Sequence, residues 1–122
     1  MTKNLDISVL LDFYGTMLTE KQRDVVELYY NEDLSLSEIA AHSGITRQGV
    51  RDSIKRAEAQ LFEYEEKLQL VARFNKIQQS LNEICESARE IYRLNKMFTS
   101  DIHINAHAKH IADLCEQISD ES

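Results

Sequence analysis

The sequence contains no proline and only three glycines, so very little in it can interrupt a helix. Apolar residues recur along it at helical spacing, and no stretch shows the convincing alternation of polar and apolar residues that a half-buried strand would show. Its 122 residues suffice for one domain, or for one small domain with an extension. We therefore predict an all-α fold of long helices.

Capping residues divide the first half of the chain into four predicted helices. The first runs from about residue 7 to 14, and the second starts after Thr19, a predicted N-cap, and ends near residue 30. Ser35 and Glu38 form a capping box that opens a short third helix, which Gly44 ends. Thr46 is the predicted N-cap of a fourth, longer helix.

The fourth helix carries an apolar stripe that extends far beyond the capping residues. From Ile54 its apolar residues alternate at steps of three and four, as in the seam of a coiled coil. At Val71, Phe74 and Ile77 the steps are all three, which predicts a bend, or two helices that meet between residues 69 and 74. We assign residues 1–60 to one domain and residues 61–122 to a helical extension.

Apolar stripes also mark the extension. After the irregular steps, the rhythm resumes in one helix and continues in a last helix over about residues 102–118. The residues expected on the apolar faces are Leu81, Ile84, Ala88 and Ile91 in the first, and Ile104, Ala108, Ile111, Cys115 and Ile118 in the second. These stripes are wider than a single hairpin needs to bury, so we predict that the extension pairs with a second copy.

The segment between Ser35 and Arg56 has the framework of a helix-turn-helix. Gly44 supplies the positive φ that a tight turn between helices needs, and Ala40 lets the two helices cross closely. We expect Ile39, Ile45 and Val50 to form the small core between these helices.

A basic stripe lies beside the predicted buried face of the fourth helix. At about 100° per residue, Arg47, Arg51 and Lys55 fall together, next to Val50 and Ile54 but distinct from them. Four basic residues and one acid lie between residues 46 and 56, although the formal net charge of the whole chain is -7. The residues expected to contact nucleic acid are Thr46, Arg47, Gln48, Arg51 and Lys55, with Arg47 and Gln48 placed to reach base edges.

Residues 18–56 resemble the fourth conserved region of bacterial sigma factors and related helix-turn-helix regulators. The chain as a whole resembles the YlxM family of small helix-turn-helix proteins, most strongly over the first 70 or so residues. That resemblance implies a regulatory role linked to the signal recognition particle pathway. Two residues depart from the general pattern: Ser43 stands where an apolar residue is usual, and Gly49 lies inside the recognition helix.

Other kinds of site have weaker support. His103, His107 and His110 share one edge of the last predicted helix, but no cysteine or carboxylate completes a metal site, so we expect solvated or interface histidines. Cys85 and Cys115 have the spacing of neither a metal site nor a redox pair, and we expect two buried thiols. No phosphate loop or nucleophile motif occurs, so we predict no enzymatic activity and no cofactor.

The sequence thus predicts a cytoplasmic, homodimeric regulator that binds nucleic acid, with DNA as the expected ligand. No run of about 18 apolar residues is present, so we expect no membrane insertion. Two alternatives stay open. The helix-turn-helix could serve packing or protein contact only, or the protein could be an adaptor that binds protein or RNA components of the signal recognition particle. From Leu61 onward eleven acidic residues face seven basic ones, which would suit a basic partner.

Overall fold

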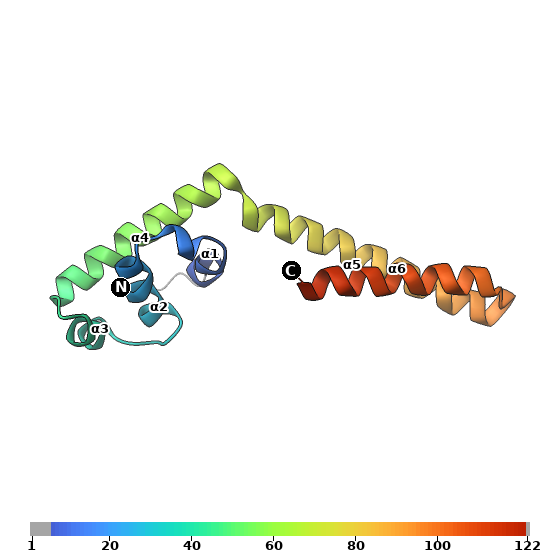
Figure 1. Ribbon diagram of the computed structural model, residues 1–122, viewed down its shortest axis with the longest axis horizontal. Coiled ribbons are helices and arrows are strands. Elements are labelled where there is room, and N and C mark those ends of the chain that lie inside the picture. Colours follow the sequence, from blue (N-terminus) through green and yellow to red (C-terminus); the bar gives the residue numbers. More distant parts are fainter. Residues whose placement is uncertain (1–5, 122) are drawn as a thin grey trace. The chain divides into compact units, whose positions relative to one another are not determined.

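The computed structural model describes residues 6–121 of the chain, and its regular structure within that range is entirely helical (Figure 1). Six α-helices and two short helical turns occur there, and these residues contain no strand. The all-α prediction is therefore confirmed. Residues 1–5 of the predicted first domain, and Ser122 at the end of the extension, lie outside the described residues.

The chain forms two compact units, one ending at Val71 and the other beginning at Ala72. The first unit contains α1 (Asp6–Tyr14), a 3-10 turn (Gly15–Met17), α2 (Glu20–Tyr30), α3 (Leu36–Ser43) and α4 (Arg47–Leu68). α4 thus continues past residue 60, where the sequence suggested a division. The division of the chain after residue 60 into a helix-turn-helix domain and a dimerisation extension stays a prediction.

The predicted helix ends in the first unit are confirmed. The Thr19 hydroxyl accepts from the Gln22 N–H at 3.2 Å, and the Ser35 hydroxyl accepts from the Glu38 N–H at 3.1 Å. In both cases the side chain of the third residue accepts from the backbone N–H of the cap, which completes a capping box. These ends form because each cap satisfies N–H groups that lack a partner in the first turn.

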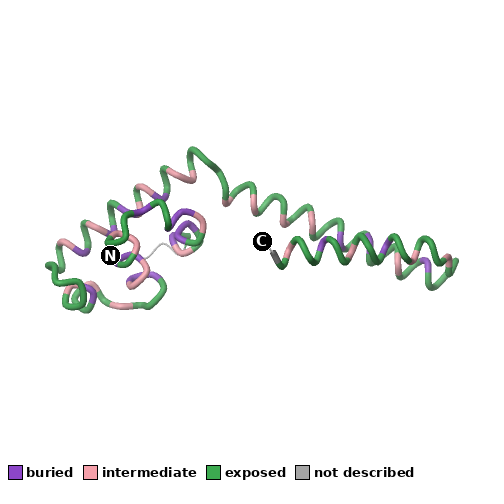
Figure 2. The backbone as a smooth tube through the Cα atoms, in the orientation of Figure 1, coloured by how far each residue is buried: buried purple, intermediate pink, exposed green. Residues whose placement is uncertain are grey.

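The core of the first unit forms where α1, α2 and α3 pack against α4 (Figure 2). Its largest fully buried side chains are Ile7, Tyr14, Val26, Ile39, Val50, Ile54 and Leu61. Burying an aliphatic side chain of this size contributes about 1.5–3 kcal/mol. The unit therefore has a core of its own, and α4 supplies the face on which the other helices pack.

A single residue, Gln69, separates α4 from α5 (Leu70–Leu94). Its φ of 54° is left-handed, and its N–H donates to the Glu65 carbonyl at 2.9 Å. The prediction that two helices meet near residues 69–74 is confirmed. The irregular apolar steps there mark the start of a new helix.

The second unit is a helical hairpin of α5 and α6 (Ile102–Glu121), connected through a π-helical turn (Asn95–Thr99) (Figure 1). The side chain of Asn95 is buried; it donates to the Asp101 carbonyl at 2.6 Å and accepts from the Asp101 N–H at 3.0 Å. The connection is thus held by a buried amide. A buried polar group in a seam of this kind also favours one register over others.

The residues buried in the hairpin agree only in part with those expected on its apolar faces. Within the described part of this unit the buried side chains are Cys85, Ala88, Asn95, Ala108 and Cys115, so the expected burial of the two thiols and the two alanines is confirmed. The large side chains expected on the same faces, Ile84, Ile91, Ile104, Ile111 and Ile118, are all exposed. They are exposed because each helix turns the neighbouring row of residues toward its partner.

Candidate nucleic-acid interface

α3 and α4 form a helix-turn-helix whose turn is only three residues long. Gly44 ends α3 with a φ of 70°, and its N–H donates to the Ala40 carbonyl at 3.0 Å. A residue with a Cβ is strained in this left-handed conformation, which explains the glycine. The short turn places the start of α4 beside α3 and restricts the orientations that the two helices can take relative to each other.

The expected framework residues divide between core and surface. Ile39 and Val50 are fully buried, and Ala40 and Leu36 are half-buried against the same core. Ile45 was expected in this core but is 45% exposed. It lies in the turn, where neither helix covers it, on the rim of a hollow of about 330 Å³ that residues of α2 also line.

The first turn of α4 is capped by Thr46, as predicted. Its hydroxyl accepts from the Gly49 N–H at 3.0 Å. A Cβ on Gly49 would stand 3.1 Å from that hydroxyl oxygen, tighter than ordinary contact, so glycine makes room for the cap. Gly49 lowers helix propensity by about 1 kcal/mol relative to Ala, and the cap offsets a cost of this size.

The backbone at this helix start can still receive an anion. The N–H groups of Arg47 and Gln48 have no partner among the described residues, because the cap satisfies only the third position. Unpaired N–H groups and the positive end of the helix dipole favour a negative ligand there. The Thr46 hydroxyl, which accepts one hydrogen bond, still has its own proton to donate.

The basic side chains predicted from the sequence lie on the outer surface of α4. Arg47, Arg51 and Lys55 are exposed, and none forms an ion pair with a described residue. Gln48 is exposed and donates through Nε2 to Asp52 Oδ1 at 2.9 Å, which leaves its amide oxygen available. The basic stripe is therefore separate from the buried row of Val50 and Ile54.

A small hollow of about 120 Å³ lies within this surface. It is lined by Arg47, Gln48 and Arg51 of α4 and by Leu36 at the start of α3. Sequence reasoning missed Leu36, although its place directly after the Ser35 cap puts it opposite the start of the next helix. The structure thus brings three of the five predicted contact residues together, and Lys55 follows one turn further along α4.

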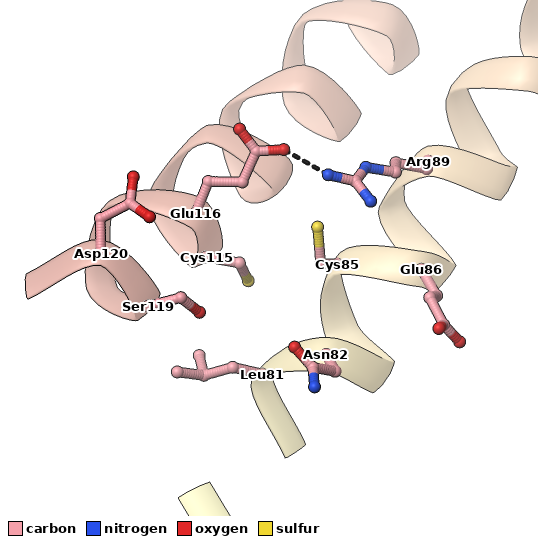
Figure 3. A pocket seen from close by; sticks show the side chains of 9 residues that line it. All are labelled: Leu81, Asn82, Cys85, Glu86, Arg89, Cys115, Glu116, Ser119 and Asp120. Carbon is pink, nitrogen blue, oxygen red and sulfur yellow. Dashed lines mark hydrogen bonds and ion pairs between the residues drawn. The ribbon is translucent and has the colours of Figure 1, made fainter. Parts of the chain in front are cut away.

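The hairpin contains a larger hollow, of about 380 Å³, between α5 and α6 (Figure 3). Cys85 and Cys115 line it from opposite helices as free thiols, and Arg89 pairs with Glu116 at its edge. No group of three or more His, Cys, Asp or Glu side chains in the described residues is arranged to hold a metal ion. His103, His107 and His110 are all exposed on α6. Within the described range, no helix is both long and apolar enough to cross a membrane.

Comparison with known proteins gives the same picture of the fold. The family described as "Putative helix-turn-helix protein, YlxM / p13 like" matches residues 1–101. A UPF0122 protein of Desulforamulus reducens is 54% identical over 78 residues, which are 64% of this chain and 67% of that protein. UPF0122 proteins of Bacillus cereus and Bacillus anthracis are 38% identical over 118 residues, covering 97% of this chain and 98% of theirs.

Proposed function

Because the chain belongs to the UPF0122 family of helix-turn-helix proteins, we propose that it is a regulator that binds nucleic acid, double-stranded DNA in particular, through the start of α4. The observation that carries the proposal is the exposed row of Arg47, Arg51 and Lys55, free of ion pairs within the described residues and separate from the core. Arg47 and Gln48 stand where a recognition helix reaches base edges. Arg51 and Lys55 are placed to hold phosphates.

The net charge of -7 does not oppose this function. Charges are screened over about 8 Å at physiological ionic strength, so a nucleic acid responds to the surface it touches and not to the average. Binding through so few cations should be weak for one copy and strongly dependent on salt. We therefore expect the protein to act as a homodimer that presents two recognition helices to half-sites roughly 34 Å apart, or a multiple of that.

Titration of fluorescent duplex DNA at several salt concentrations tests the proposal. Arg47→Ala plus Arg51→Ala should weaken binding by at least about 30-fold, since each lost arginine contact costs about 1–3 kcal/mol. The matched control is Arg73→Ala plus Lys76→Ala, which removes the same charge from exposed residues outside the stripe. Equal losses in both variants, or no binding at low salt, would refute the proposed interface.

The regulatory context is the part of the proposal that depends on family resemblance alone, which links it to the signal recognition particle pathway. Co-purification from cell extract with and without nuclease addresses it. Loss of all partners after nuclease treatment supports binding through nucleic acid. A protein partner of the particle that survives the treatment would instead support the adaptor function.

A further inference from the structure

Most large apolar side chains of the second unit lie on one edge of the hairpin, whereas the apolar residues buried in its seam are small. Six isoleucines form this edge at repeats of seven residues on each helix, and we call it the isoleucine edge: Ile77, Ile84, Ile91, Ile104, Ile111 and Ile118. Their exposed fractions run from 39% to 57%. A repeat of seven keeps a row of side chains on one side of a helix over its whole length.

The two rows of isoleucines lie on the same side of the hairpin. The seam is the line of buried and half-buried residues where α5 and α6 face each other. Each isoleucine directly precedes a residue of this seam; Ile84, for example, precedes Cys85, and Ile111 precedes Ala112. In two antiparallel helices, the residues that precede the seam flank it on one side, and those that follow it flank the other. Arg89 and Glu116 each follow a seam residue, and they pair across the opposite edge (Figure 3).

Without this edge, the described part of the hairpin buries no large apolar side chain fully. Its buried residues in the described range are two alanines, two cysteines and an asparagine, and a hollow of about 380 Å³ remains between the helices. A unit of about 50 residues is marginal even with a full hydrophobic core, so one that leaves its isoleucines in water needs a partner surface.

We infer that the isoleucine edge is where a second copy of this chain docks, so that two hairpins form a four-helix bundle around the isoleucines. An identical copy supplies the same seven-residue spacing, as a two-fold symmetric interface requires. With Phe98, which follows Ile91 by seven residues and lies in the π-helical turn, the edge exposes on the order of 600 Å² of apolar surface per copy. Leu94 and Leu114 beside it bring this close to the ~800 Å² per partner of a stable interface.

Charge also favours a second copy. The central part of the row next to the isoleucines contains Ser80, Ser87 and Leu94 on α5, and His107 and Leu114 on α6, none of them acidic or basic by the formal count; the charged members of this row, Arg73 and Glu121, lie at its ends. Two copies can therefore meet along the central part of the row without opposing like charges, although the chain as a whole is acidic. This inference rests on the dimer of the proposed function and names the surface that forms it.

The test measures the mass of the full chain by sedimentation equilibrium in the absence of nucleic acid. We expect the native chain to have twice the 14.1 kDa of one chain. Ile84→Glu plus Ile111→Glu should raise the dissociation constant at least about 1000-fold, since two buried anchors each cost 2 kcal/mol or more. The control, Gln79→Glu plus Ala106→Glu, adds the same charge at exposed positions off the edge and should stay dimeric.

A photo-cross-linking amino acid keeps the test decisive even if the double variant fails to fold. A benzophenone side chain in place of Ile84 should give covalent dimers, and the same group in place of Gln79 should not. A monomeric native chain, or equal cross-linking from both positions, would overturn the inference. Arg47→Ala plus Arg51→Ala should remain dimeric, so loss of DNA binding and loss of the dimer are distinguishable.

Discussion

The hydroxyl of Tyr14 holds the junction between α4 and α5, and removing it should destabilise the first unit. Tyr14 is fully buried. Its hydroxyl donates to Glu65 Oε1 at 2.5 Å and accepts from the Leu70 N–H at 3.0 Å. The same Glu65 oxygen accepts from the Val71 N–H at 3.1 Å, so α1 and α4 together cap the first turn of α5.

Tyr14→Phe keeps the ring in the core and deletes both hydrogen bonds. A bond to a charged acceptor contributes about 1.5–3 kcal/mol, and a neutral one about 1 kcal/mol. Part of this is recovered because Glu65 keeps its bond to Val71 and the junction is only part-buried. We therefore expect a loss of about 2–3 kcal/mol in the free energy of unfolding.

Urea denaturation followed by circular dichroism measures this loss as a lower midpoint with an unchanged slope. Tyr64→Phe is the matched control, because its hydroxyl makes only a long 3.4 Å bond to the Met17 carbonyl at an exposed site. We expect the control to change stability by less than about 0.5 kcal/mol. If Tyr14→Phe and Tyr64→Phe lose similar free energies of unfolding, the hydrogen bonds at the junction contribute little to stability.

The same hydroxyl predicts a pH dependence. Burial raises the pKa of Tyr14 above its usual 10.0, and donation to Glu65 raises it further. A raised folded-state pKa means that the neutral phenol is favoured on folding. Its stabilisation is complete below the unfolded pKa of about 10 and is lost as the pH rises toward the folded pKa. The difference in stability between the native chain and Tyr14→Phe should therefore narrow above pH ~10, and a constant difference would contradict this reasoning.

Two further substitutions test the local structure of the first unit. Gly44→Ala should destabilise the first unit by about 1–2 kcal/mol in thermal unfolding, because alanine is strained at a φ of 70°. The cause is the backbone conformation alone, since nothing lies within 4 Å of the added Cβ. An unchanged stability would mean that the turn has another conformation. Ile54→Ala should cost about 2–5 kcal/mol by urea denaturation, because the residue is fully buried on the face of α4 that packs against the core, whereas Lys55→Ala, an exposed neighbour, should change stability by less than about 0.5 kcal/mol.

The helix ends of the first unit were predictable because a cap depends on a few consecutive residues. A hydroxyl at Ser35 can reach the Glu38 N–H whatever the rest of the chain does, and the left-handed φ at Gly44 likewise follows from the glycine. The exposure of Ile45 could not be predicted from the neighbouring residues alone. Its side chain is apolar, but a three-residue turn directs it to the rim of a hollow, and only the tertiary path of the chain decides that.

The seam of the hairpin was not predictable from apolar periodicity because two rows share the same repeat. Ile84 and Ile91 recur at seven residues, and so do Cys85 and Tyr92 directly after them. Hydrophobicity favours the isoleucines for the inner face. In the single chain, α5 and α6 turn the row that contains Cys85 and Tyr92 toward each other, and the isoleucines remain on the edge. A partner surface for the isoleucines would bury both rows. The apolar pattern of the sequence therefore fits a dimer better than it fits a single chain.

Because the basic stripe is narrow, dimerisation should change how strongly DNA binding depends on salt. Arg51 and Lys55 are placed to neutralise about two phosphates from one recognition helix, which corresponds to a slope of about -2 in log K against log salt. Two copies on one duplex would double that slope, because twice as many phosphates are neutralised. In the Ile84→Glu, Ile111→Glu variant the slope should therefore fall back to about -2 while the stripe is intact. Loss of DNA affinity without a change of slope would mean that one helix binds at a time, and that the isoleucine edge has a role unrelated to recognition.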